Sequence, residues 1–142
     1  MSDVVLVTGA SGFVGAAVAR AALARGFKTR VLMRQGSNHA NIAGLKVEPV
    51  EGDMRDADSM ARALSGTRYL FHVAADYRLW AKDPSEIERN NLLGARATMQ
   101  AALTAGVERV VYTSSVAALK PGNGEAVDET SRHTPQSAIG AY

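Results

Sequence analysis

The chain contains no cysteine and only three histidines, so the residues that form disulfide bonds and most zinc sites are absent or few. Without cysteine, neither a disulfide bond nor a zinc site built on thiolates can form. The histidines His39, His72 and His133 are scattered and do not have the spacing of metal ligands. We therefore predict no metal site.

An excess of charge of one sign is also lacking. The 16 basic and 14 acidic residues leave a formal charge of +2, and no run of lysine or arginine suggests a nucleic-acid-binding surface. No apolar run approaches the length of about 18 residues that would cross a bilayer. The first residues, Met1-Ser2-Asp3, lack the basic residue and the long apolar stretch of a signal peptide. We expect a cytoplasmic protein without an integral membrane segment and without a nucleic-acid partner.

What the chain does have is enough apolar sequence for one core, with 46% hydrophobic and 21% charged residues in 142 positions. Strand-like runs alternate with helical stretches. Strands are expected at residues 3–8, 28–33, 47–51, 69–74 and 107–113, and helices at 13–25, 56–64 and 84–104. This alternation predicts an α/β, Rossmann-type, doubly wound parallel sheet of strand order 3-2-1-4-5. Pro49 places the third strand at one edge, because proline cannot donate to a ladder.

The glycine-rich loop T-G-A-S-G-F-V-G, residues 8 to 15, lies between the first strand and the first helix. Gly9 would permit a tight exit from the strand, Gly12 the close approach of a pyrophosphate, and Gly15 close packing of the helix. The phosphates would then meet the amides that open the helix, those of Phe13 and Val14 included. The alternative is a tight turn without a ligand.

The spacing G-x-x-G-x-x-G resembles the extended branch of the short-chain dehydrogenase/reductase superfamily, the NAD-dependent epimerase/dehydratase family. That resemblance implies that Asp53 accepts from the adenine amine with Met54 alongside, and that Asn91 braces the active site, with Asn90 as its rival. For Asp53 the alternative is a helix or turn cap. Besides the loop glycines, Phe13 and Val14, the cofactor-binding residues implied are Arg34, Asp53, Met54, Ala74, Ala75, Asn91 and Thr113.

The choice of nicotinamide cofactor depends on the end of the second strand. An NAD-binding protein usually places an acid there for the ribose 2′-hydroxyl, but Leu32-Met33-Arg34-Gln35 contains none. The planar fork of Arg34 suits a 2′-phosphate, which favours NADP(H) and leaves NAD(H) open. Alternatively, Arg34 stacks on adenine or faces solvent.

The catalytic residues that the resemblance implies are Ser115 and Tyr142. Ser115 is the second serine of V-Y-T-S-S, and Tyr142 follows it by 27 residues, where the family places the tyrosine of Tyr-x-x-x-Lys. The lysine would stand at position 146, beyond the chain. We therefore interpret residues 1–142 as an incomplete dinucleotide-binding domain, cut inside its catalytic motif, whose substrate-binding C-terminal part is absent. The alternatives are turn chemistry at Ser115 and an accidental terminal residue at Tyr142.

The run H-V-A-A-D-Y-R-L-W narrows the resemblance to the hopanoid-associated sugar epimerase and dihydroflavonol-4-reductase-like group. Tyr77, Arg78 and Trp80 would contact the substrate, at the carboxyl ends of the strands. The alternative is that Trp80 packs on the long helix and that Arg78 pairs with an acid.

The resemblance thus implies an NAD(P)-dependent oxidoreductase or sugar epimerase that passes hydride between nicotinamide and a substrate carbinol or carbonyl carbon. Its partner would be a small molecule, a sugar or a flavonoid- or sterol-like alcohol or ketone. We expect the fragment itself to be inactive without the lysine and to self-associate through an unpaired fifth strand, or to dock its own polar tail there. The alternative function is a non-catalytic NAD(P)-binding or sensor module.

Overall fold

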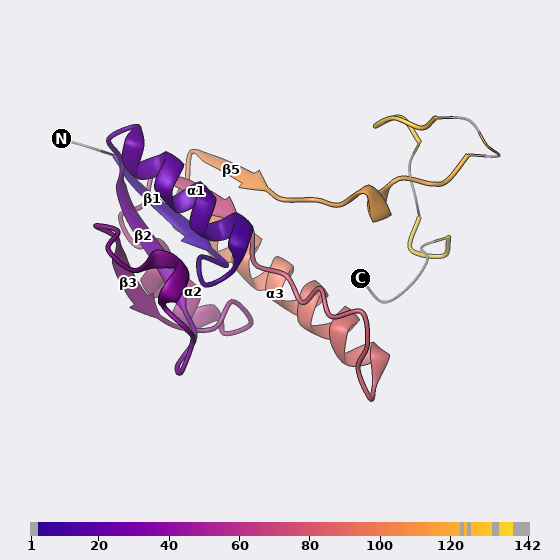
Figure 1. The fold of residues 1–142 in the computed structure, drawn as a ribbon, viewed down its shortest axis with the longest axis horizontal. Coiled ribbons are helices and arrows are strands. Elements are labelled where there is room, and N and C mark those ends of the chain that lie inside the picture. The colour runs from indigo at the N-terminus through magenta and orange to yellow at the C-terminus, as the bar shows by residue number, and fades with distance from the viewer. Residues whose placement is uncertain (1–2, 123, 125, 132–133, 138–142) are drawn as a thin grey trace.

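The computed structural model describes residues 3–122, 124, 126–131 and 134–137, and it alternates strands with helices along the chain. Figure 1 shows the arrangement of these elements. In chain order the elements are β1 Val4–Thr8, α1 Phe13–Ala24, β2 Lys28–Met33, the 3₁₀ turn η1 Ala40–Ile42, β3 Glu48–Glu51, α2 Ala57–Leu64, β4 Tyr69–His72, α3 Pro84–Thr104, β5 Arg109–Tyr112 and the 3₁₀ turn η2 Val116–Ala118.

All neighbouring strands pair in parallel, in the order β3-β2-β1-β4-β5. The doubly wound Rossmann-type sheet expected from the sequence is therefore confirmed. β3 lies at one edge, where Pro49 stands opposite Val31 of β2, as the proline predicts.

The central strand β1 is buried on both faces, which explains its nearly continuous apolar sequence. Successive side chains of a strand point to opposite faces. Leu6 accordingly packs into a cluster with Met60 of α2 and Ala102 of α3, whereas Val7 packs into a second cluster with Ala16 of α1. Helix α1 therefore covers one face of the sheet, and α2 and α3 cover the other.

The expected element bounds hold to within a few residues. The largest difference is at β5, which spans Arg109–Tyr112 rather than residues 107–113, and the difference at β4 has a physical cause. β4 ends at His72 rather than at Ala74. The amides of Val73 and Ala74 donate to the hydroxyl oxygen of Thr8 at 3.0 and 3.1 Å, so these two residues form a crossing between strand ends instead of a ladder.

Helix α3 begins and ends at the residues that the sequence indicates. The carboxylate of Asp83 accepts from the Ser85 amide, Pro84 occupies the first turn, and Gly106 follows the helix with φ +70°. The carboxylate of Glu86, in the first turn, accepts from Arg78 at 3.0 Å.

The β5 edge of the sheet leaves apolar side chains exposed. Val111 and Tyr112 are exposed, and within the described residues no strand lies beyond β5. The described part of the chain after β5 leads away from the sheet (Figure 1), so docking of the polar tail onto β5 is not observed in that part. None of the described helices is long and apolar enough to cross a membrane.

Candidate functional site

The loops that follow the five strands lie at the same end of the sheet, because the carboxyl ends of parallel strands all point the same way. The loops after β1, β2, β3, β4 and β5 carry most of the site residues indicated by the sequence; the others lie at the start of α1, on α3 and at the chain end. The parallel topology thus gathers residues that lie far apart in the chain.

The glycine loop after β1 approaches the loop after β4 closely. Gly9 has φ +75°, and a Cβ placed on it would lie 2.8 Å from the backbone nitrogen of Ala74. The amide of Gly12 donates to the carbonyl of Gly9 at 3.0 Å, which closes the turn. Only glycine fits at position 9, in both conformation and space.

Helix α1 begins without a side-chain cap. Gly12 is its N-cap, no side chain accepts from the first-turn amides, and no acidic residue lies in that turn. These amides and the positive end of the helix dipole therefore form a site for an anion such as a phosphate. Phe13 is 87% exposed and Val14 is exposed beside it, so the opening of the helix is accessible.

Gly15 seats the first turn of α1 against the loop. A Cβ at this position would lie 2.1 Å from the carbonyl oxygen of Gly9 and 2.8 Å from the amide nitrogen of Ala10. The residue therefore sets the distance between helix and loop, and through the loop the distance between helix and sheet.

A buried clasp joins the ends of β1 and β4. The Thr8 hydroxyl oxygen accepts from the Val73 and Ala74 amides and lies 2.9 Å from Nδ1 of His72. Since two amides already donate to this oxygen, its own hydrogen is directed at Nδ1, and His72 carries its proton on Nε2. Burial lowers the pKa of His72 to about 4, which keeps the ring neutral and the clasp intact near neutral pH.

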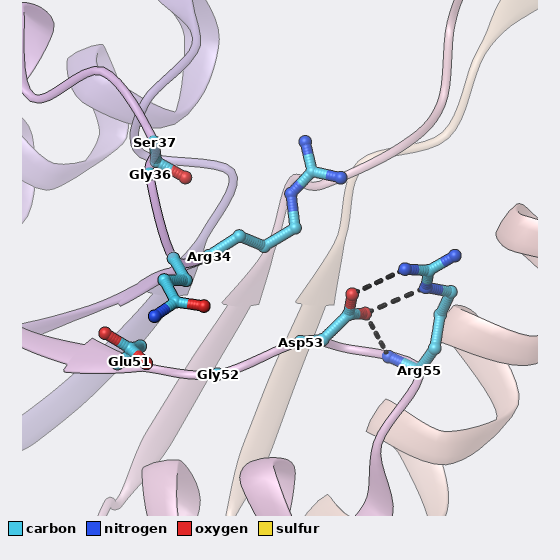
Figure 2. Close-up of a pocket in the computed structure, with 8 residues that line it drawn as sticks. Arg34, Gly36, Ser37, Glu51, Gly52, Asp53 and Arg55 are labelled. Atoms are coloured by element: carbon cyan, nitrogen blue, oxygen red, sulfur yellow. Dashed lines mark hydrogen bonds and ion pairs between the residues drawn. The ribbon is translucent and has the colours of Figure 1, made fainter.

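A pocket of about 470 Å³ opens between the ends of β2 and β3 (Figure 2). Arg34 and Asp53 extend from neighbouring strand ends over this opening. The pocket is lined by Arg34, Gln35, Gly36, Ser37, Glu51, Gly52, Asp53 and Arg55.

Arg55 holds the carboxylate of Asp53 in a two-point ion pair. Its Nε donates to Oδ1 at 3.0 Å and its Nη2 to Oδ2 at 2.7 Å, while its backbone amide donates to Oδ1 at 2.9 Å. These hydrogen bonds, with the side-chain bond from Arg55 foremost, lower the pKa of Asp53. Asp53 thus makes the turn contact proposed as its alternative role and also lines the pocket. The cap of α2 is Asp56.

Met54 points away from this pocket, toward α3. A Cβ at Gly94 would lie 2.7 Å from its terminal methyl carbon, so Gly94 makes room for the Met54 side chain. Met54 therefore packs at the margin of the core rather than lining the opening beside Asp53.

The two asparagines of α3 hold the loop after β4 in different ways. Asn91 accepts from the Asp76 amide at 2.7 Å and donates to the Asp76 carbonyl at 2.9 Å. Asn90 accepts from Arg55 at 3.0 Å and donates to the Asp76 carboxylate at 3.2 Å. Asn91 fixes the loop backbone, and Asn90 bridges two charged side chains.

The three residues proposed to contact substrate differ in their surroundings: Arg78 is held by ion pairs, whereas Tyr77 and Trp80 are exposed. Arg78 forms a two-point pair with Asp76 at 2.8 and 2.6 Å and also contacts Glu86 at 3.0 Å, so the alternative that it pairs with acids is correct. This pairing keeps the pKa of Asp76 well below its usual range. Trp80 is 78% exposed and Tyr77 73% exposed, so Trp80 does not pack on the long helix as the alternative supposed.

Thr113 and Ser115, which follow β5, make hydrogen bonds of different kinds. The amide of Thr113 donates to the carbonyl of His72 at 2.9 Å, which ties β5 to β4. Ser115 is half-buried, and its hydroxyl oxygen accepts from the Ala117 amide at 3.2 Å, so it makes the turn contact foreseen for it. Tyr142 lies outside the described residues.

The structure brings three polar residues into the site that were not predicted from the sequence: Thr8, His72 and Arg55. Thr8 and His72 each end a buried apolar strand, and a polar side chain at that position was the available signal. Arg55 had no such signal, because its role depends on Asn90, which is 35 residues away in the chain.

The chain is similar to known proteins over nearly its whole length. It is 43% identical over 143 residues to a dihydroflavonol 4-reductase-like protein of Synechocystis sp., covering all of this chain and 41% of that protein. The crystal structure of a protein designated gox2253 superimposes with a TM-score of 0.91 at 51% identity, covering 99% of this chain and 43% of the other. The chain thus spans less than half the length of these relatives.

A more distant solved structure is the dTDP-glucose 4,6-dehydratase DesIV of Streptomyces venezuelae, crystallised with NAD. It has a TM-score of 0.82 at 30% identity, with 95% of this chain and 46% of that chain covered. The model of the NAD dependent epimerase/dehydratase family matches residues 5–142, nearly the whole chain. This protein belongs to the NAD-dependent epimerase/dehydratase family.

Proposed function

We propose that the protein is an NAD(P)-dependent oxidoreductase or epimerase of the extended short-chain type. The observation that carries this proposal is the glycine loop, whose uncapped amides open α1 directly beside the backbone of the β4 loop. Such a cradle fits a diphosphate, and the related DesIV structure contains NAD. When bound, the nicotinamide would supply the hydride chemistry, and the protein would supply placement and electrostatics.

The diphosphate of the coenzyme would bind at Gly9, Gly12 and Gly15, with the amides of Phe13 and Val14 donating to it. No acidic side chain lies in this first turn, so no charge opposes the anion. Ala74 and Ala75 would lie against the coenzyme, since the Ala74 backbone packs beside Gly9 and both side chains are small. Thr113, at the end of β5, would complete this wall.

The adenine end would occupy the pocket between β2 and β3, with its amine donating to Asp53. Three donors already occupy this carboxylate, which has about four lone-pair positions, so one position is left for the amine. Met54 would support this end from beneath, since its side chain packs toward Gly94.

Coenzyme preference is proposed as NADP(H), with NAD(H) open. Arg34 reaches over the pocket, no acid pairs with it among the described residues, and Ser37 adds a hydroxyl to the same wall. Glu51 and Asp53 line the pocket too and would oppose a phosphate. The preference for NADP(H) therefore depends on whether the attraction of a 2′-phosphate to Arg34 exceeds its repulsion by these two carboxylates.

The chemical step is assigned to Ser115 and Tyr142. The Ser115 hydroxyl would orient the substrate oxygen, and the Tyr142 phenol would donate or accept the proton. A phenol titrates near pH 10, about three units above neutrality, so it needs a neighbouring cation to exchange protons there. Position 146, where the family's lysine would stand, is not part of the 142 residues, so we expect coenzyme binding without turnover from this chain.

The substrate would be a small alcohol or ketone, either a sugar or a flavonoid- or sterol-like compound. Exposed Tyr77 and Trp80 would supply stacking faces, and Arg78 would hold their loop through its acid pairs. We propose residues 1–142 as the dinucleotide-binding part, with most substrate contacts made by sequence such as the relatives carry beyond the matched region. A cytoplasmic location stays a prediction.

Calorimetric titration with NADPH and with NADH tests the proposal, with Gly12→Ala as the decisive variant. A Cβ at Gly12 would lie 3.4 Å from the nearest atom, which is an ordinary contact, so the fold should tolerate it. The added methyl group would stand where the diphosphate approaches, so affinity should fall by about tenfold or more. Exposed Ser11→Ala in the same loop serves as the control and should bind normally. Absence of binding to the parent chain would reject the proposal.

A further inference from the structure

A continuous series of hydrogen bonds leads from the adenine pocket to the loop that carries Trp80. Arg55 holds both oxygens of Asp53 and donates through Nη1 to Asn90 at 3.0 Å. Asn90 in turn donates to the carboxylate of Asp76 at 3.2 Å. We call these four residues, Asp53, Arg55, Asn90 and Asp76, the relay. It crosses from the loop after β3, over α3, to the loop after β4.

The far end of the relay holds the loop after β4 in place. Asp76 is anchored by Asn91 through its backbone and by Arg78 through both carboxylate oxygens. The neighbouring side chains of Tyr77 and Trp80 are mostly exposed and contribute little packing. Ala81 is the buried residue of this loop and is small, so the position of the loop depends on that contact and on the polar contacts at Asp76.

The near end of the relay faces the pocket. Arg55 is a planar fork that engages Asp53 at two points, so the orientation of one side chain fixes that of the other. An amine arriving at the remaining lone pair of Asp53 would restrict the carboxylate further without displacing Arg55.

We infer that Arg55 is a positioning residue that couples occupation of the adenine pocket to the order of the substrate loop, residues 75–83. Each exposed ion pair alone contributes little, so the coupling arises from the shared geometry of the relay. The inference rests on the proposed function for its ligand, since it assumes that a purine amine binds at Asp53.

AMP is the probe that separates coupling from direct contact. It carries adenine and one phosphate but no nicotinamide, so a change at Trp80 on AMP binding must pass through the protein. Trp80 is the single tryptophan of the chain and reports on the loop by fluorescence. We expect AMP to shift Trp80 emission and to slow trypsin cleavage after Arg78 and Lys82.

Asn90→Asp breaks the relay at one bond with little change of shape. The new carboxylate still accepts from Arg55 but cannot donate to Asp76 and repels it. The emission shift and the protease protection should be lost, whereas AMP affinity, measured by calorimetry, should change by less than about fivefold. Arg55→Ala should also abolish both responses. Arg68→Ala serves as the control, because Arg68 pairs with Asp3 and Glu108 at the opposite end of β4. Both responses should persist in this variant.

The outcomes separate the two proposals. If AMP binds the parent chain without changing Trp80 emission, or if Asn90→Asp retains the full response, the coupling is overturned and the proposed function stands. If neither AMP nor NADPH nor NADH binds, the proposed function fails, and the coupling fails with it.

Discussion

The central strand β1 and the edge strand β5 differ in how far their side chains are buried. In β1, Val5, Leu6 and Val7 are fully buried between α1 on one face and α2 with α3 on the other. In β5, Val111 is 47% exposed and Tyr112 52% exposed. The half that carries the glycine loop therefore contains its own core, whereas the half that carries Ser115 leaves apolar surface uncovered within the described residues.

This difference indicates where substitutions should matter. Near β1, backbone segments approach each other so closely that a single methyl group does not fit. Beyond Thr113, most described residues are exposed, and their backbone hydrogen bonds are local turns, except that the Lys120 amide donates to the Ser131 carbonyl at 3.0 Å. We expect the free energy of unfolding to be determined mainly by the first region and the association state mainly by the second.

The largest expected effect comes from Gly15→Ala. The added Cβ would stand 2.1 Å from the Gly9 carbonyl oxygen, and neither backbone segment can yield without disturbing the other. The substitution should lower the free energy of unfolding by about 3 kcal/mol or more in urea titrations. Gly122→Ala, at an exposed position after β5, should change it by less than about 0.5 kcal/mol. Equal effects at both positions would contradict the comparison.

Acid should weaken the same region through His72. Its pKa is lowered from 6.5 to about 4 in the folded protein, so the unfolded chain takes up this proton first as the pH falls. The contribution is fully present above the unfolded value and is lost between pH 6.5 and 4, amounting to about 3 kcal/mol in urea titrations across that window.

His72→Gln serves as the reference for this pH effect, since glutamine is neutral and can still accept from Thr8. The variant should show a flatter dependence of unfolding free energy on pH within the window. Carboxylates with lowered pKa values, such as Asp53 and Asp76, lose their contributions only at more acidic pH, below their usual 3.8. Identical slopes for parent and variant would rule out His72 as the cause.

Thr8→Val should have a somewhat smaller effect. Valine has nearly the same shape but leaves the Val73 and Ala74 amides without their buried acceptor. The expected loss is about 2 kcal/mol in thermal or urea unfolding. Thr8→Ser keeps the hydroxyl and should recover most of it, and a serine variant as weak as the valine variant would show that the methyl group matters instead.

The smallest effect on stability, but a clear one on association, is expected for Val111→Glu. A charge on the exposed face of β5 should reduce self-association without changing the unfolding free energy by more than about 0.5 kcal/mol. Light scattering over a concentration series measures this. A parent chain that is already a monomer at every concentration would remove the basis for the prediction.

The sequence predicted the sheet order because its signals are local and repeated. The buried run of β1, the glycines after it and the proline of β3 each constrain one element, and parallel crossovers then leave few topologies. The glycine loop was predictable for the same reason, since its residues are contiguous.

The relay was not predictable, because its members contact one another only after folding. Asp53 and Arg55 are near in sequence, but nothing in D-M-R-D indicates that Arg55 also reaches Asn90 on a distant helix. Similarly, the sequence left open whether Arg78 contacts substrate or pairs with an acid. The structure shows its ion pairs with Asp76 and Glu86, and the substrate contact stays a prediction. The exposure of Trp80 depends on the path of an irregular loop, which no periodicity specifies.

The position of the core along the chain bears on synthesis at the ribosome. Both buried clusters draw their buried members from residues up to Ala102. Because domains generally begin folding from the N-terminal side during translation, this core can close before the residues around Ser115 emerge. The nascent chain would then form the glycine loop and the start of α1 first, and the strand end that carries Ser115 would be added to a framework already in place.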